Sequence, residues 1–280
     1  MYDFASDPLI GLTQTRLGWM FYPRNDRYVG RSLELYGDYA RLEYEVFRRI
    51  VRPGDTVVDA GANIGVHTVH FSALAGPGGH VLAFEPQRAL FQILNANLMM
   101  NRCANVQPLP FCVGAEDGWV DFPQVPLDTP VNFGGIGRDT PAARRERTQT
   151  RAIDGFGLER CDFIKIDVEG AEASVIEGAR RTISGLRPTL CVEAESAERI
   201  AGWFDGLRSS GYRAFRMVPL LFTPGNWKKC RENVFGRTIN INLLAFPGDA
   251  PDWAADPALG LRPADTVDAF FEGLNTASRA

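Results

Sequence analysis

Four acidic residues follow or end four mostly apolar stretches of the sequence, at Asp59, Glu85, Asp167 and Glu193. Each stretch has the length and composition of a buried strand. The carboxyl ends of parallel strands meet at one edge of a sheet, and ligands bind there. The four carboxylates are therefore expected to surround one ligand, where they can accept hydrogen bonds, balance a positive charge or take up a proton.

The loop after Asp59 reads GANIG, and its spacing differs from the GxGxxG pattern that binds a pyrophosphate. Gly61 and Gly65 allow positive φ and a close approach of the ligand, and Asn63 is the non-glycine residue best suited to the same backbone region. Asn63 also adds an amide that can hydrogen-bond a ligand. An acid before this loop suits a cationic amine better than a pyrophosphate. We expect Asp59, Gly61, Asn63 and Gly65 to bind such a ligand.

Glu85 ends the second predicted strand. A carboxylate at this place can accept hydrogen bonds from both ribose hydroxyls of a nucleoside. The simpler alternative is an acid favoured by the N-terminus of the next helix. A ligand with a ribose, a cationic amino-acid end and no phosphate is S-adenosylmethionine. Cys112 and Val113, at the end of the third predicted strand, and Asp167 complete the expected cofactor-binding residues.

The segment FIKIDVEGAE places Lys165 and Asp167 on the same face of one strand. Buried charges are unfavourable unless they are paired, so we expect a polar cluster here. In one interpretation the cluster is catalytic, with Asp167 or Glu169 as the base and Lys165 as an ion-pair partner rather than a base. In the other, Asp167, Glu169 and Glu193 hold a divalent cation such as Mg²⁺ through oxygen atoms.

The segments DAGANIGVHT, FEP and FIKIDVEGAEASVIEGA resemble the FkbM-type family of class I S-adenosylmethionine-dependent methyltransferases. The resemblance runs from roughly Tyr39 to Glu195, and KIDVEGAE is its most specific element. It implies an α/β fold with the doubly wound, mostly parallel, seven-stranded Rossmann-like methyltransferase sheet, in which the last strand is antiparallel. It also implies O-methylation of a hydroxyl group on a sugar, a glycan or a natural product.

Alternating strand and helix patterns agree with this fold class. Strands are expected at 56–59, 80–85, 106–113, 163–168, 189–193, 212–218 and 239–246, and helices at 39–50, 66–74, 88–100, 171–183 and 198–210. We expect residues 1–50 to form an N-terminal extension, 51–248 the methyltransferase domain and 249–280 a tail. Prolines and Gly134-Gly135 mark 122–150 as an insertion or lid.

The composition argues against several other classes of protein. A formal net charge of −4 gives no overall attraction to nucleic acid, and the five cysteines form no CxxC pair typical of a zinc site. No stretch has the apolar length of a membrane span, and the N-terminus lacks the features of a secretory signal. We therefore expect a cytoplasmic protein with a small-molecule or glycan acceptor and no nucleic-acid partner.

Two alternatives to an active O-methyltransferase remain at this point. One is a catalytically silent methyltransferase-like domain that binds a cofactor or a partner. The other is a nicotinamide-dependent oxidoreductase, which the missing GxGxxG pattern disfavours.

The acceptor site is less clearly indicated. The three histidines, His67, His70 and His80, all precede the end of the second predicted strand, so we expect none of them at the acceptor. The segment NWKKCREN (226–233) combines an aromatic side chain with cations. It could contact an anionic acceptor, or it could be a solvated loop.

Overall fold

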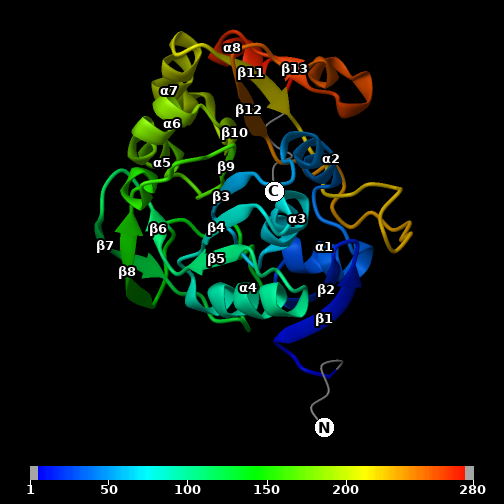
Figure 1. Cartoon of the computed structure of the whole chain (residues 1–280). Coiled ribbons are helices and arrows are strands. Elements are labelled where there is room, and N and C mark those ends of the chain that lie inside the picture. Colours follow the sequence, from blue (N-terminus) through cyan, green and yellow to red (C-terminus); the bar gives the residue numbers. More distant parts are fainter. Residues whose placement is uncertain (1–5, 275–280) are drawn as a thin grey trace.

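The computed structural model describes residues 6–274, and one large sheet runs through the middle of the molecule (Figure 1). Five neighbouring strands of this sheet are parallel. In spatial order they are β5 (Val106–Leu109), β4 (His80–Phe84), β3 (Thr56–Ala60), β9 (Phe163–Ile166) and β10 (Thr189–Glu193).

Beyond β10 the sheet continues with antiparallel pairs. β12 (Asn242–Pro247) pairs antiparallel with β10, and β11 (Tyr212–Met217) pairs antiparallel with β12. These seven strands confirm the predicted doubly wound α/β sheet with one antiparallel strand. An eighth strand that was not predicted, β13 (Arg262–Pro263), is only two residues long and pairs with β11.

Helices cover both faces of the sheet, and its parallel strands are therefore apolar on both sides (Figure 1). On one face, the rings of Phe47, Phe71 and Phe163 pack at centroid distances of 5.3 to 5.5 Å. The helices of this face are α2 (Arg41–Ile50) and α3 (Val66–Ala75). Those of the opposite face are α5 (Glu172–Gly178), α6 (Arg180–Leu186), α7 (Ala197–Ser209) and α8 (Val267–Phe271).

Two predicted elements are divided in the structure. The expected strand 106–113 ends at Leu109, because Pro110 has no N–H group to continue the ladder, and β6 (Cys112–Val113) joins a different sheet. The expected helix 171–183 becomes α5 and α6, because Ala179 has φ −109° and ψ 9°, which interrupts the helix. The cavity described below lies close to the first of these breaks.

The N-terminal residues form a hairpin that packs on helix α4 (Arg88–Met100). The hairpin consists of β1 (Ile10–Thr15) and β2 (Gly18–Pro23), and helix α1 (Val29–Tyr36) follows it. The buried Asn97 amide of α4 donates hydrogen bonds to the carbonyl groups of Phe21 and Ile64. One side chain therefore ties the hairpin to the loop that follows β3.

A second, small sheet lies beside the main one. β7 (Gly118–Pro123) pairs antiparallel with β8 (Arg145–Arg151), and β6 pairs parallel with β8. The two ends of the predicted insertion at 122–150 are thus strands, and 124–144 connects them. Short 3₁₀ turns at Ile153–Phe156, Asp252–Ala255 and Pro257–Leu259 complete the described elements. The division into 1–50, 51–248 and 249–280 stays a prediction.

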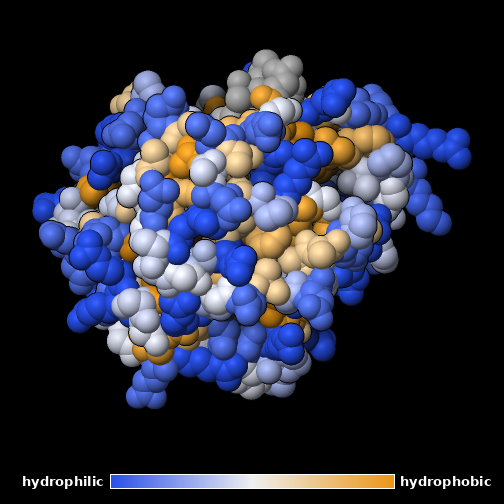
Figure 2. Space-filling model, turned by 90° about the horizontal axis from the view of Figure 1, so that it is seen from above, coloured by the Kyte–Doolittle hydropathy of each residue, from blue (hydrophilic) through white to orange (hydrophobic). Residues whose placement is uncertain are grey.

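The outer surface combines polar and apolar side chains. On the face seen from above in Figure 2, hydrophilic side chains predominate, and apolar ones form small groups between them. Such scattered apolar groups are normal on a water-exposed surface. Within residues 6–274, no helix has the length and apolar character needed to span a bilayer.

Candidate active site

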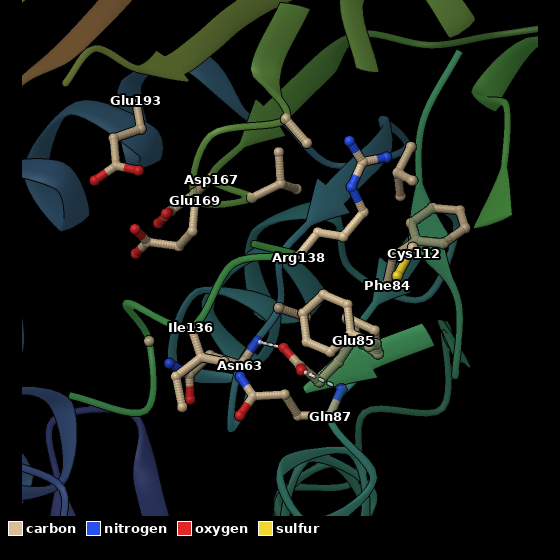
Figure 3. A pocket seen from close by; sticks show the side chains of 18 of the residues that line it. Asn63, Phe84, Glu85, Gln87, Cys112, Ile136, Arg138, Asp167, Glu169 and Glu193 are labelled. Carbon is tan, nitrogen blue, oxygen red and sulfur yellow. Dashed lines mark hydrogen bonds between the residues drawn. The ribbon is translucent and has the colours of Figure 1, made fainter. Parts of the chain in front are cut away.

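A cavity of about 310 Å³ lies at the carboxyl ends of the parallel strands. This is the edge at which ligands bind in such sheets. Most of the predicted cofactor residues line the cavity (Figure 3); these are Gly61, Asn63, Glu85, Cys112, Val113 and Asp167. Lys165, Glu169 and Glu193 line it as well. Asp59 and Gly65 are buried and do not line the cavity.

The loop between β3 and α3 has the backbone that its sequence predicts. Gly61, Asn63 and Gly65 all have positive φ, at 87°, 52° and 89°. A Cβ atom on Gly61 would lie 1.7 Å from the carbonyl oxygen of Asp167, so the backbone of this loop touches the end of the neighbouring strand. Only glycine fits at this point. The close approach brings the loop and Asp167 to the same wall of the cavity.

Glu85 is 4% exposed and is fixed by two backbone donors. Its carboxylate accepts hydrogen bonds from the N–H groups of Asn63 and Gln87, both at 2.8 Å (Figure 3). Burial raises the pKa of Glu85 to about 7, although the two N–H donors favour the charged form. Charges on Asp59 and Asp167 raise the pKa further. A rigid acceptor therefore faces the cavity, and hydroxyl donors from a ligand would stabilise its charge.

Asp59 is fully buried within β3. Its Oδ2 atom accepts a hydrogen bond of 2.6 Å from the Thr68 hydroxyl, and its Oδ1 atom lies 3.9 Å from the Lys165 ammonium. These contacts hold the start of α3 against β3. A direct contact between Asp59 and a ligand stays a prediction.

Three carboxylates gather at the other end of the cavity (Figure 3). Asp167, Glu169 and Glu193 each place one oxygen within 4.8 Å of the others. Burial, followed by the charges of nearby acids, raises the pKa of Glu169 to about 9 and that of Glu193 well above its usual value. Glu193 Oε2 is buried and has no hydrogen-bond partner among residues 6–274. This carboxylate cluster (Asp167, Glu169 and Glu193) therefore favours bound protons or a bound cation.

Lys165 is the cation closest to this cluster. Its ammonium lies 2.9 Å from Asp167 Oδ2. Burial lowers the pKa of Lys165, but the charges of Asp167 and Asp59 more than offset burial and raise it above the usual value. An ammonium held in this way does not accept a proton, which agrees with the expected role as an ion-pair partner.

The connection between β7 and β8 supplies another part of the wall. Asn132, Gly134, Ile136 and Arg138 line the cavity. The carbonyl group of Phe133, a buried residue, accepts a hydrogen bond of 2.9 Å from the Gln87 side chain. Residues of the predicted insertion thus form part of the cavity wall, and a role as a lid stays a prediction.

Comparison with known proteins identifies the family. Residues 59–214 match the sequence model described as the methyltransferase FkbM domain, which is more than half of the chain. The chain belongs to the FkbM methyltransferase family. This confirms the resemblance found in the sequence.

Curated relatives of this FkbM family member are similar to it over part of their length. Methyltransferase 1 of Beauveria bassiana is 28% identical over 148 residues, which cover 45% of this chain and 59% of that protein. The 31-O-demethyl-FK506 methyltransferase FkbM of Streptomyces tacrolimicus is 33% identical over 179 residues, covering 59% of this chain and 64% of that protein. The chain therefore spans about three fifths of the length of these relatives.

A crystal structure of methyltransferase FkbM from Methylobacillus flagellatus KT is also similar to this chain. It has 21% sequence identity and a TM-score of 0.44, and the match covers 73% of this chain and 50% of that one.

Several side chains of this FkbM family member that were not predicted as site residues also line the cavity, among them Tyr39 and His67. His67 thus lies at the cavity, and the expectation that no histidine lies at the acceptor stays a prediction. His67 is the second residue of α3, and the N-terminal end of this helix faces the edge of the sheet where ligands bind. This position in the sequence was the signal that could have placed His67 at the cavity. His70 is buried and stacked on Tyr44, and burial lowers its pKa to about 3. His80 is exposed at the start of β4.

The segment 226–233 does not line the cavity. The Lys228 ammonium instead donates hydrogen bonds to the carbonyl groups of Leu33 and Glu34 at the end of α1. The predicted contact between this segment and an acceptor is therefore wrong for the cavity described here. The Lys228 cation of this segment thus contacts α1 of the same chain.

Proposed function

We propose that this FkbM family member is an S-adenosylmethionine-dependent O-methyltransferase. Its acceptor would be a hydroxyl group on a sugar, a glycan or a natural product. The observation that carries the proposal is the buried Glu85 carboxylate, held by two N–H groups beside the glycine-containing loop at the cavity wall. The name of one relative records methylation at an oxygen of FK506, which supports an oxygen acceptor.

We orient the proposed cofactor by the residues that line the cavity, from the adenine at one end to the methionine at the other. Glu85 would accept hydrogen bonds from the ribose hydroxyls. The adenine would lie toward Phe84 and Cys112, which line the cavity near Glu85 (Figure 3). The methionine end would then lie along Gly61 and toward Asp167, where carboxylates balance its amine and sulfonium charges.

Methyl transfer from a sulfonium is an in-line displacement. The acceptor oxygen attacks the methyl carbon, the C–S bond breaks, and its electron pair stays on sulfur as a neutral thioether. Much of the rate can come from holding oxygen, carbon and sulfur in line. The hydroxyl group also loses a proton, so a base is needed near the acceptor. Asp167 and Glu169 are the carboxylates that the sequence indicates for this role.

The carboxylate cluster also fits a divalent cation, because it offers three oxygen ligands and includes the unpartnered Glu193 Oε2 atom. Such an ion, when bound, would lower the pKa of an acceptor hydroxyl. We propose a test by calorimetric titration with MgCl₂ of the wild type, of Glu193→Gln and of the control Glu177→Gln, whose side chain is on the surface of α5. Loss of Mg²⁺ binding only in Glu193→Gln supports the site, and no binding by the wild type rejects it.

The proposed activity is tested in two steps. Isothermal titration should show binding of S-adenosylmethionine and little binding of NAD. Methyl-labelled S-adenosylmethionine is then incubated with a panel of monosaccharides, glycans and polyketide alcohols. Transfer of label to an oxygen supports the proposal. Binding of NAD in place of S-adenosylmethionine would point to an oxidoreductase, and cofactor binding without transfer to any acceptor would point to a catalytically silent domain.

A further inference from the structure

The side chains of His67 and Glu43 are in close contact beside the cavity. His67 Nε2 lies 2.8 Å from Glu43 Oε2, and their side chains are 11% and 5% exposed. A carboxylate only accepts hydrogen bonds, so at this distance we assign a proton to Nε2. In a neutral imidazole the lone pair is then on Nδ1.

The Glu43 carboxylate is itself fixed. Its Oε1 atom accepts a hydrogen bond of 2.9 Å from the Asn242 amide, and all three members of this relay belong to different elements, α3, α2 and β12. The rings of Phe47 and Phe71 pack beside the imidazole at centroid distances of 5.3 and 6.1 Å. A buried carboxylate is unfavourable unless it is fully paired. Here the pairing also fixes the orientation of the imidazole.

His67 is the member of this pair that lines the cavity. Glu85, Gly61 and Asp167 would be occupied by the ribose and the amino-acid end of the cofactor. Tyr39, His67, Asn240 and Glu193 also line the cavity, and we place the acceptor beside them. An acceptor that approaches the sulfonium from this side therefore meets the imidazole.

We propose that His67 is the general base of methyl transfer and that Glu43 positions it; this rests on the proposed function. The acceptor oxygen forms its bond to the methyl carbon while the C–S bond breaks. The hydroxyl proton passes to Nδ1 of His67. The products are the methyl ether, the neutral thioether of the spent cofactor and an imidazolium that Glu43 stabilises.

The other titratable groups on this wall are less suited to accept the proton. Asp167 is paired with the Lys165 ammonium at 2.9 Å, and Glu169 shares its site with two other carboxylates within 4.8 Å. Lys165 is a paired ammonium, and Tyr39 is a phenol whose pKa burial raises further. The charged or titratable groups around His67 come from five parts of the fold. They are Tyr39 from the segment before α2, Glu43 from α2, His70 from α3, Lys165 from β9 and Glu193 from β10.

The test measures turnover, with the hydroxyl acceptor that accepts label in the panel, and cofactor affinity by calorimetry. His67→Gln should lower kcat by a factor on the order of 10² to 10⁴, the usual range for loss of a general base. Its affinity for S-adenosylmethionine should stay within about twofold. The acidic limb of the pH–rate profile should disappear, because that limb reports a base that must be unprotonated. His80→Gln, at an exposed site, is the matched control.

Two further measurements separate a base from a structural residue. Glu43→Gln should lower kcat less than His67→Gln and shift the acidic limb, because it leaves the imidazole without its carboxylate partner. In His67→Ala, added imidazole should restore part of the turnover, provided that thermal unfolding shows a folded protein. Nitrogen-15 NMR of the imidazole groups should show a proton on Nε2 of His67 in the wild type, whatever the acceptor.

Each outcome decides for or against the inference. Normal turnover in His67→Gln, or a proton on Nδ1 in the NMR spectrum, would overturn it. A loss of cofactor affinity in His67→Gln with unchanged kcat would make His67 a cofactor ligand instead. If the wild type fails to bind S-adenosylmethionine, the proposed function itself fails, and this result differs from all of the others.

Discussion

At the scale of single residues, Glu85 combines burial with donors for its charged form. The N–H groups of Asn63 and Gln87 stabilise the carboxylate, but burial outweighs them and raises its pKa to about 7. The site thus contains a carboxylate that is only partly ionised at neutral pH before a ligand binds. Ribose hydroxyls and a cationic ligand would both favour the ionised form.

The affinity for S-adenosylmethionine should therefore rise with pH. At pH 6 a group with a pKa of about 7 is roughly 10% ionised, so the affinity should be up to about tenfold lower than at pH 8. Glu85→Gln should bind more weakly and lose this dependence. Calorimetry in buffers of different ionisation enthalpy should detect proton release on binding near pH 6.5. A flat affinity profile in the wild type would remove Glu85 from the cofactor site.

The Glu85 carboxyl group affects the stability of the fold in the opposite direction, so that stability falls as the pH rises. Its folded-state pKa is raised above the ordinary value, so its contribution to stability is present at low pH and is lost as the pH rises through about 7. Glu85→Gln resembles the protonated form and should be more stable than the wild type at pH 8.

At the scale of elements, the loop after β3 and the end of β9 are held together by a backbone contact. No side chain fits between Gly61 and the Asp167 carbonyl group. Asn97 of α4 ties the same loop to the N-terminal hairpin. The shape of the cavity wall therefore depends on how closely these elements pack.

Gly61→Ala should destabilise the protein by about 3–5 kcal/mol, because its Cβ atom would clash with the Asp167 carbonyl oxygen and its φ of 87° is unfavourable for alanine. Gly78→Ala is the matched control, since a Cβ atom there has no neighbour within 4 Å. It should stay within about 1 kcal/mol of the wild type. Equal denaturant midpoints for the two variants would contradict the close approach.

At the scale of the whole molecule, a distant segment fastens the N-terminal elements. Lys228, in the connection between β11 and β12, donates hydrogen bonds to Thr13 Oγ1 and to two carbonyl groups at the end of α1. A cation at this helix end is also favoured by the helix dipole. The segment 226–233 is therefore assigned to holding the fold together.

Lys228→Met should lower the free energy of unfolding by about 1–2 kcal/mol, because it removes the donor from the partly buried contacts with Thr13 and Leu33. Lys229→Met, at the neighbouring exposed residue, should have little effect. Cofactor affinity should be unchanged in both variants. Unchanged stability together with a raised KM for the acceptor in Lys228→Met would return this segment to the acceptor site.

The sequence alone predicted the sheet, the positive φ at Gly61, Asn63 and Gly65, and the gathering of Glu85, Asp167 and Glu193 at one edge. These features follow from local preferences and from one rule, that parallel strands carry their carboxyl ends to the same edge. The break after Leu109 was missed, although Pro110 was a local signal for it.

Only the tertiary structure decided which residues complete the site. The pair formed by His67 and Glu43, its partner Asn242 and the docking of Lys228 on α1 join segments that are far apart in the sequence. The distances within the carboxylate cluster are also a tertiary property. A periodic pattern shows that a helix has a buried face, but the neighbour that this face meets depends on how the helices pack over the sheet. The local sequence therefore fixes the ligand edge, and packing places His67 there.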